Sequence, residues 1–113
     1  MTLAAISAER SVVRFARAAL TAAHAGLAVY RTPFSKQQFT QPQLLAVLCL
    51  RNEYGWSLRE TESALRQDRE IRAALALREP PDHTTLYRFA GRLPPGELER
   101  ALSAARARAR AAE

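Results

Sequence analysis

The sequence predicts an all-α protein in which five to six helices form one bundle around a buried central helix. Apolar residues recur three and four positions apart along most of the chain, and no run alternates between apolar and polar residues as a strand does. Alanine supplies much of the 48 % hydrophobic content, whereas β-branched and aromatic residues, which favour strands, are few. Prolines and N-capping residues separate the helical segments. A chain of 113 residues is long enough to bury one core.

The first predicted helix covers residues 6–27. Its apolar side chains fall on one helical stripe, formed by Ile6, Val13, Ala16, Leu20, Ala23 and Leu27. A basic edge lies beside that stripe and consists of Arg10, Arg14 and Arg17. Thr32 and Pro33 end the helix, and a polar connector follows to Phe39. The apolar stretch of residues 18–30 is too short to span a membrane, and its helical stripe argues against a signal peptide.

The second predicted helix is the central one. Thr40 is a good N-cap, Pro42 suits the first turn, and Gln43 stands at the position that completes a capping box. The apolar residues that follow point in nearly every direction around the axis: Leu44, Leu45, Val47, Leu48, Cys49 and Leu50. A helix that is apolar on all sides is buried, so we expect the other helices to pack against this one until it ends within residues 52–55.

Two short helices are predicted next. Ser57 and Glu60 form a second capping box, which opens a helix over residues 57–66. Its narrow apolar side is Leu58, Thr61 and Leu65, and its outward residues are Arg59, Glu62 and Arg66. Asp68 caps a short helix over residues 69–76, whose inward residues are Ile71, Ala74 and Leu75. Pro80 and Pro81 end this unit.

A helix over residues 82–93 and a last helix over residues 96–112 complete the prediction. The first has an inward face of Leu86, Phe89, Ala90 and Leu93 and an outward face of Thr84, Arg88, Gly91 and Arg92, flanked by Thr85 and Tyr87. Pro94 and Pro95 separate it from the last helix, which carries a stripe of Leu98, Leu102, Ala105 and Ala109.

Composition indicates a polyanionic partner and gives no support to catalysis. The net charge is +6, and Lys36 is the only lysine, so arginine supplies almost all of the positive charge. The only aspartates, Asp68 and Asp82, each start a helix, and the two histidines and single cysteine form no metal-binding pattern. There is no glycine-rich phosphate loop. We therefore expect no catalytic residues, metal or cofactor in this chain. Cys49 alone allows no internal disulfide and fits a reducing cytoplasm.

The outward face of residues 84–92 is the candidate DNA-binding surface. A ten-residue helix is about 15 Å long and fits the major groove, which is about 12 Å wide. Arginine reads guanine or grips phosphates, and hydroxyl groups do either. The candidate DNA-binding residues are His83, Thr84, Thr85, Tyr87, Arg88 and Arg92, with Arg59 and Arg66 on the supporting helix. The other interpretation is a solvated basic face that binds nothing.

The distance between the supporting helix and this one is longer than the turn of a helix-turn-helix. Either the short helix 69–76 is inserted between them, or that helix is itself the recognition element, through Arg69 and Arg72. We favour the first, because Glu70 shares the surface of those two arginines. Trp56 is predicted to seal a turn over the core. His83 is predicted to be a hydrogen-bonding residue at a helix start, and residues 106, 108 and 110 a solvated arginine-rich helix end.

Three segments resemble the N-terminal region of DDE-type insertion-sequence transposases. They are Thr40-Gln41-Pro42-Gln43-Leu44-Leu45-Ala46, then Ser57-Leu58-Arg59-Glu60-Thr61-Glu62 with Leu65, then Pro81-Asp82-His83-Thr84-Thr85-Leu86-Tyr87-Arg88-Phe89. The resemblance covers about residues 35–93. It implies a helical region that recognises the terminal inverted repeats of a mobile element. It also implies an RNase H-like domain with an Asp, Asp, Glu set that binds two divalent metals, and the sequence stops where that domain is expected to begin.

The resemblance leads to a set of expectations. Residues 1–34 form an amphipathic helix and connector, residues 35–93 the DNA-binding domain, and residues 94–113 a helix toward the missing catalytic domain. The expected partners are double-stranded DNA with inverted repeats, a second copy of the chain or an intact transposase, and not a membrane. The expected location is the cytoplasm, with the nucleoid. The alternative is a protein–protein module in which the stripes of helices 6–27 and 98–112 mediate oligomerisation.

Overall fold

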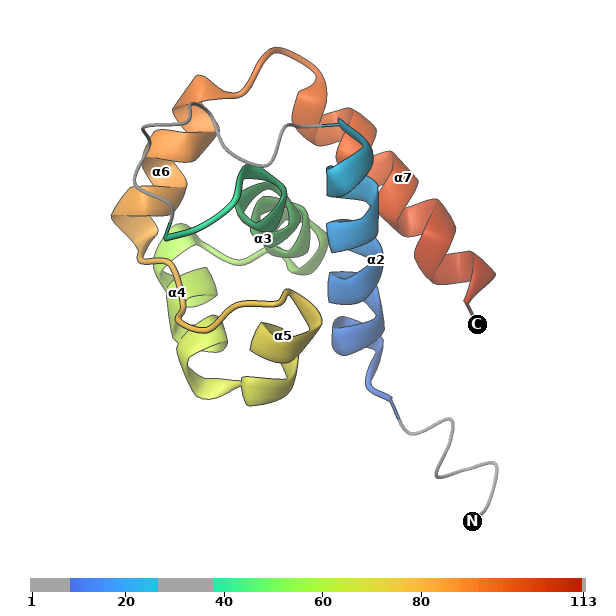
Figure 1. The fold of residues 1–113 in the computed structure, drawn as a ribbon, viewed down its shortest axis with the longest axis horizontal. Coiled ribbons are helices and arrows are strands. Elements are labelled where there is room, and N and C mark those ends of the chain that lie inside the picture. Colours follow the sequence, from blue (N-terminus) through green and yellow to red (C-terminus); the bar gives the residue numbers. More distant parts are fainter. Residues whose placement is uncertain (1–8, 27–37, 113) are drawn as a thin grey trace.

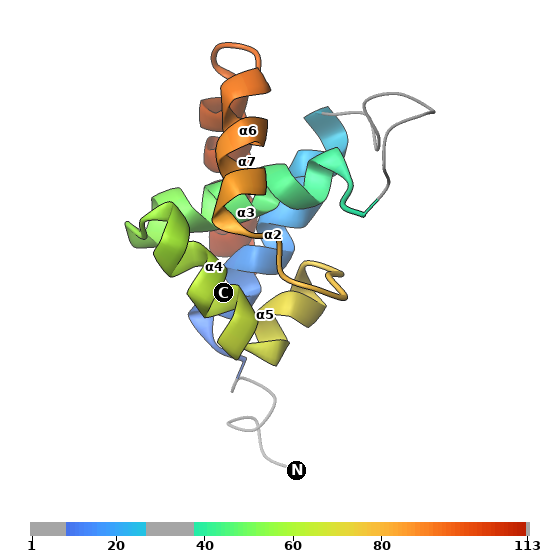
Figure 2. The same ribbon diagram turned by 90° about the vertical axis from the view of Figure 1, so that its left-hand side faces the viewer.

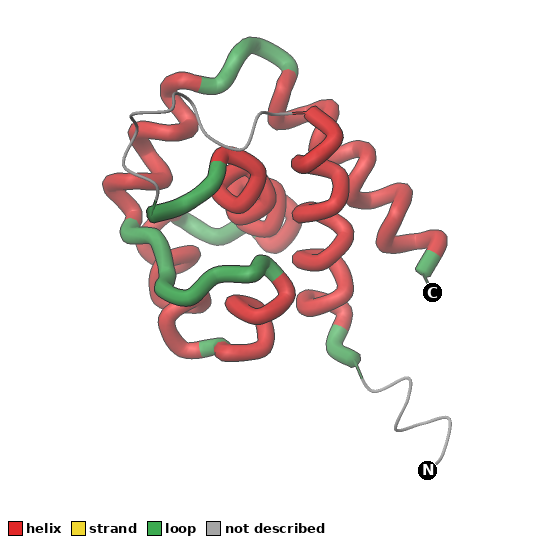
Figure 3. Tube along the Cα trace, viewed as in Figure 1, coloured by secondary structure: helices red, strands yellow, loops and turns green. Residues whose placement is uncertain are grey.

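The computed structural model describes residues 9–26 and 38–112, and this part of the chain contains helices and loops but no strand (Figures 1 and 3). Its helices are α2 (Ser11–Gly26), α3 (Gln41–Tyr54), α4 (Leu58–Gln67), α5 (Arg69–Ala74), α6 (His83–Arg92) and α7 (Glu97–Ala111). The predicted all-α class is confirmed. Ile6, Leu27, the break at Thr32 and Pro33, and the boundary between residues 34 and 35 lie outside the described residues.

Helix α3 occupies the centre, as predicted. The Thr40 hydroxyl accepts a hydrogen bond from the Gln43 backbone N–H at 3.1 Å, and the Gln43 side-chain oxygen accepts one from the Thr40 N–H at 2.9 Å. Every residue from Leu44 to Leu50 is buried. Gly55 ends the helix in the left-handed conformation, with φ of 70°. Helices α2, α4, α6 and α7 all contact α3, which is seen nearly end-on among them in Figure 1.

Helices α2 and α7 lie side by side and both contact α3. The buried side of α2 is wider than the predicted stripe: Phe15, Ala19 and Ala22 are buried in addition to Val13, Ala16 and Ala23. The reason is that α2 packs against α3, α5 and α7 at once, so that one stripe is not enough. Of its predicted stripe, helix α7 buries Ala105 and only partly buries Leu98, Leu102 and Ala109; it also buries Ala101, which the predicted stripe did not include. Small alanine side chains let these helices approach closely.

Helices α4 and α5 meet at a single residue, Asp68, which ends one and caps the other. Its carboxylate accepts the Ile71 N–H at 3.1 Å and pairs with the Arg10 guanidinium at 2.8 Å. Burial favours a raised pKa for Asp68, but hydrogen bonds from Arg10 and the Ile71 backbone outweigh it and lower that pKa. Arg72 donates to the carbonyl oxygens of Leu65 at 2.6 Å and Arg66 at 2.7 Å. Carbonyls at the end of α4 that have no partner within the helix are thereby satisfied.

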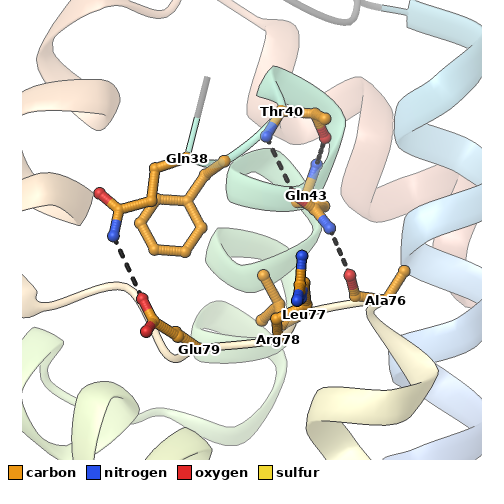
Figure 4. A pocket seen from close by; sticks show the side chains of 8 residues that line it. Gln38, Thr40, Gln43, Ala76, Leu77, Arg78 and Glu79 are labelled. Atoms are coloured by element: carbon orange, nitrogen blue, oxygen red, sulfur yellow. Dashed lines mark hydrogen bonds between the residues drawn. The ribbon is translucent and has the colours of Figure 1, made fainter. Parts of the chain in front are cut away.

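The segment after α5 is tied to the start of α3, and it carries the chain toward α6. Ala76 adopts the left-handed conformation with φ of 57°, and its carbonyl accepts the Gln43 side-chain amide at 2.7 Å. Gln38 donates to the Glu79 carboxylate at 3.2 Å across a hollow of about 650 Å³ (Figure 4). These contacts hold the segment between α5 and α6 against the start of α3.

Candidate nucleic-acid interface

Helix α6 is capped by Asp82 and anchored by two buried side chains. The Asp82 carboxylate accepts the Thr85 N–H at 2.7 Å, and hydrogen bonds from the Thr85 backbone and side chain hold the pKa of Asp82 below its ordinary value. Leu86 and Phe89 are buried against the core. Ala90, predicted to point inward, is exposed, because α6 contacts only α3 and α4 and a residue about 100° beyond Phe89 reaches neither.

The opposite face of α6 is open to solvent. Its exposed residues are Thr84, Tyr87, Arg88, Ala90, Gly91 and Arg92. Tyr87 is 70 % exposed, which makes it the most exposed large hydrophobic side chain among residues 9–26 and 38–112. Neither the Arg88 nor the Arg92 side chain makes a hydrogen bond or ion pair with any described residue. The helix sequence contains no aspartate or glutamate. The guanidinium groups on this face therefore have no acidic neighbour on their own helix.

Figure 2 looks onto this side of the molecule, where α6 lies in front of α3, with α4 below it. Helix α6 contacts α3 and α4 and makes no contact with α2, α5 or α7 among the described residues. Its outer face is therefore free along the length of the helix, as lying in a DNA groove requires.

The start of α6 is fastened to α4 through Glu62. One carboxylate oxygen of Glu62 accepts the His83 backbone N–H at 2.8 Å and lies 2.8 Å from His83 Nδ1. The other oxygen pairs with Arg66 of the same helix. The Glu62 side chain is only 16 % exposed, so the prediction that it points outward is wrong. Hydrogen bonds from the His83 side chain and backbone lower the pKa of Glu62. His83 is thus a hydrogen-bonding residue at a helix start, as predicted.

The remaining candidate residues divide into exposed and engaged groups. Arg59 is exposed on α4, whereas Arg66 is exposed but paired with Glu62. Thr85 is half-buried beside its partner Asp82, so it is less accessible than Thr84. These positions place the accessible candidates on α6 and along the adjoining edge of α4.

Helix α5 offers less as a recognition element. Arg72 is used to cap α4, and Glu70 pairs with Arg10 at 2.7 Å, which leaves Arg69 as the exposed arginine of this helix. The helix has six residues and packs on α2. Both observations favour α6 over α5, in agreement with the interpretation that α5 is inserted between α4 and α6.

Three further residues considered in the sequence are Trp56 and Cys49, which lie in or against the core, and Arg106, which forms an ion pair. The Trp56 ring stacks on Tyr54 with centroids 5.6 Å apart and packs against the core, as predicted. Cys49 is fully buried, and burial raises the pKa of its thiol to about 12. Arg106 was predicted to be solvated, but it pairs with Glu53 of α3 at 2.7 Å. The sequence could not indicate this pair, because the two residues are 53 positions apart.

Within the described residues, no group of three or more His, Cys, Asp or Glu side chains is placed to hold a metal ion. The helices of that part are all too short or too polar to cross a membrane. No family model matches the sequence, and neither a curated protein nor a solved structure is similar enough to count as a relative.

Proposed function

We propose that this protein is a DNA-binding module that recognises the terminal inverted repeats of an insertion sequence, as the N-terminal region of a DDE-type transposase does. In this proposal α6 lies in the major groove, and DNA cleavage and transfer belong to a separate metal-dependent domain. The observation that carries the proposal is the outer face of α6, where Arg88 and Arg92 are exposed and unpaired within the described residues.

Physical chemistry favours a nucleic-acid ligand for this face. An arginine whose guanidinium has no carboxylate partner is free to bind guanine O6 and N7 in a bidentate manner, or to grip a phosphate. Tyr87 and Thr84 add exposed hydroxyl groups on the same side. The Tyr87 ring is 70 % exposed, so in this proposal it is free to pack against the sugars of the bound DNA or to donate its hydroxyl group to a phosphate.

Helix α4 holds the start of α6 in this arrangement. The Glu62 carboxylate holds the first residue of α6, and Arg66 is held by the same carboxylate. Arg59 lies about two turns before Arg66 on the same helix. In the proposal Arg59 and Arg66 contact backbone phosphates at the rim of the groove, while α6 contacts the base edges.

The experiment starts from a pool of randomised DNA duplexes, because the target sequence is unknown. Repeated selection with the protein is expected to enrich one sequence, and fluorescence anisotropy then compares that duplex with a scrambled one. Arg88→Ala and Arg92→Ala are each expected to cost about 1–3 kcal/mol, or roughly 5- to 150-fold in affinity, if the guanidinium reads a base. Removing a phosphate contact instead reduces the log–log salt slope by about 0.9.

Two matched controls accompany these variants. Arg69→Ala removes the exposed arginine of α5, and Arg108→Ala removes one from α7; neither residue lies on α6. Both controls are expected to bind the selected duplex nearly as well as the unaltered protein. Failure to enrich any sequence, or equal losses from all four variants, contradicts sequence recognition by α6. A larger loss from Arg69→Ala than from Arg88→Ala would assign recognition to α5.

The alternative role in oligomerisation receives no specific support from the structure. The stripes on which it depended face each other and α3 within one chain. Val13, Ala16 and Ala23 of the first stripe are buried, and so is Ala105 of the second. The surface that these stripes were expected to offer to a second copy is therefore largely occupied inside the molecule.

A further inference from the structure

A second basic surface lies on the other side of the molecule from α6. It is a groove of about 390 Å³ between α2, the end of α3 and the second half of α7. Arg14 comes from α2 and Arg106 and Arg110 from α7, and the groove also contains Glu53 and Tyr54 of α3. Helices α2 and α7 run in opposite directions, so the first turns of α2 lie beside the last turns of α7 (Figure 1).

The groove carries more positive charge than its single carboxylate balances. Glu53 is engaged by the Nε group of Arg106 at 2.7 Å. The side chains of Arg14 and Arg110 make no hydrogen bond or ion pair with any residue that the structure describes. Arg106 and Arg110 are four residues apart and therefore share one face of α7. Two unpaired guanidinium groups, donated by different helices, thus border the same groove.

The helix dipole explains one of these arginines but not the other. Arg110 lies in the last turn of α7, where a positive charge is favourable. Arg14 lies at the start of α2, where the helix dipole is positive and a cation is unfavourable, and the first turn of α2 contains no acidic residue. The helix dipole therefore does not account for the positive charge of Arg14. A bound anion would make this charge favourable.

Tyr54 adds a hydrogen-bond donor to the groove. Its ring packs edge-on against Phe15, with the ring centroids 6.2 Å apart, and stacks on Trp56. Tyr54 nevertheless remains 39 % exposed. Burial, and then the charge of Glu53, raises the pKa of Tyr54, so its hydroxyl group stays protonated at neutral pH. A protonated phenol can donate to a phosphate oxygen.

We propose that the α2–α7 groove, lined by Arg14, Tyr54, Arg106 and Arg110, binds the phosphate backbone of duplex DNA without reading its sequence. Guanidinium and hydroxyl donors arranged along a groove suit consecutive phosphates. In Figure 1 α6 and α7 lie at opposite sides of the molecule, with α2 and α3 between them, and they make no contact with each other. The groove would thus hold a DNA segment other than the one on α6.

This inference rests on the proposed function only in taking DNA as the partner, and the test separates the two. Binding to a random-sequence duplex is measured against salt concentration in the Arg88→Ala/Arg92→Ala protein, which lacks the α6 arginines. In that protein, adding Arg14→Gln and Arg110→Gln is expected to reduce the log–log salt slope by about 1.8, because two phosphate contacts are lost. Adding Arg69→Gln and Arg108→Gln instead removes the same amount of charge elsewhere. The slope of that protein is expected to stay within about 0.5 of the slope of the Arg88→Ala/Arg92→Ala protein.

Each outcome of this test decides one of the proposals. Equal slopes for the groove and control variants contradict the proposal that the groove binds DNA. Recognition by α6 is tested separately, by the affinity of the Arg88→Ala and Arg92→Ala proteins for the selected duplex. A slope that falls only in the groove variant supports the groove even where α6 fails its own test. Circular dichroism checks that every variant is folded. Arg110→Gln alone, at an exposed position, is expected to give about half the change in slope, so a folding defect of Arg14→Gln does not remove the test.

A second measurement tests whether two DNA segments bind at once. Duplexes of the selected sequence with a donor dye and random duplexes with an acceptor dye are mixed with the unaltered protein. Energy transfer between them is expected, and it should be lost in Arg14→Gln/Arg110→Gln while affinity for the selected duplex is retained. Energy transfer that persists in this variant contradicts the groove.

Discussion

Gly91 stands on the exposed face of α6, and a Cβ built there would meet no atom within 4 Å. Glycine inside a helix costs up to about 1 kcal/mol relative to alanine, so helix stability does not favour it at this position. The lack of a side chain leaves the backbone accessible between Arg88 and Arg92. A DNA phosphate or sugar can approach the helix more closely there than at any residue with a Cβ.

Replacing Gly91 with alanine should separate stability from binding. Gly91→Ala is expected to raise the free energy of unfolding by about 0.5–1 kcal/mol, measured by urea denaturation, because alanine is the better helix former. Affinity for the selected duplex is expected to fall several-fold, since the methyl group occupies the space of the close approach. Ala90→Gly, at the neighbouring exposed position, is the matched control. It is expected to lower the free energy of unfolding by about the amount that Gly91→Ala raises it. A more stable Gly91→Ala protein with unchanged affinity would show that DNA does not approach this backbone.

Predictions at single residues succeeded where the partner is near in sequence. Thr40, Ser57, Asp68 and Asp82 each cap a helix by accepting the N–H three residues ahead, and a spacing of three is readable from sequence. The helical pattern predicted that Glu62 points outward. That prediction was wrong because its partner, His83, lies 21 residues away in the sequence. Contacts at that range depend on how helices pack, which periodicity alone does not define.

Between elements, the joint of α4 and α6 depends on the charge of Glu62. A carboxyl whose pKa is lowered in the folded state stabilises that state while it is ionised. The contribution is fully present above the ordinary glutamate pKa of 4.5 and is lost as the pH falls through the lower pKa of the folded protein.

The unaltered protein is therefore expected to lose stability more steeply than Glu62→Gln as the pH falls from 5 to 3. Urea denaturation at several pH values measures the difference between the two proteins, which should be largest at neutral pH and shrink below pH 4.5. Glu99→Gln is the control, because Glu99 is exposed and makes no ion pair with a described residue. Parallel pH curves for the unaltered protein and Glu62→Gln would contradict a role for this carboxylate in the joint.

The existence and order of the helices were easier to predict than which side of each helix is buried. Helices α3 to α7 begin at capping residues or after prolines and end within a few residues of the predicted bounds. The inward faces were partly wrong, as Ala90 shows, because the buried side of a helix depends on how many neighbours it has. Helix α6 has two neighbours and a narrow buried side, whereas α2 has three and a wide one.

For the whole molecule, the alanine-rich packing of α2 should tolerate no larger side chain. Ala19 is fully buried on a helix that contacts α3, α5 and α7. Ala19→Leu is expected to lower the free energy of unfolding by about 1–3 kcal/mol, because the added carbons force the helices apart. Ala25→Leu, on the exposed side of the same helix, should change it by less than about 0.5 kcal/mol. Equal effects in urea denaturation would show that α2 is not closely packed.

The packing of α2 against α7 could not be predicted from the sequence. Each helix carries an apolar stripe, but a stripe only shows that a face is buried and does not identify its neighbour. The same stripes are also compatible with burial against a second copy of the chain, and oligomerisation therefore remained an alternative. The groove with Arg14 and Arg110 depends on that pairing, so it too was invisible in the sequence.

Because every side chain of α3 from Leu44 to Leu50 is buried, the backbone amides of this stretch exchange hydrogen with water only when neighbouring helices separate from it. Helices α6 and α7 never touch, yet both rest on this shared support. The two DNA-binding sides proposed for the molecule are therefore coupled through a single cooperative transition. DNA bound at either side stabilises the folded state as a whole and, by mass action, keeps the other side assembled.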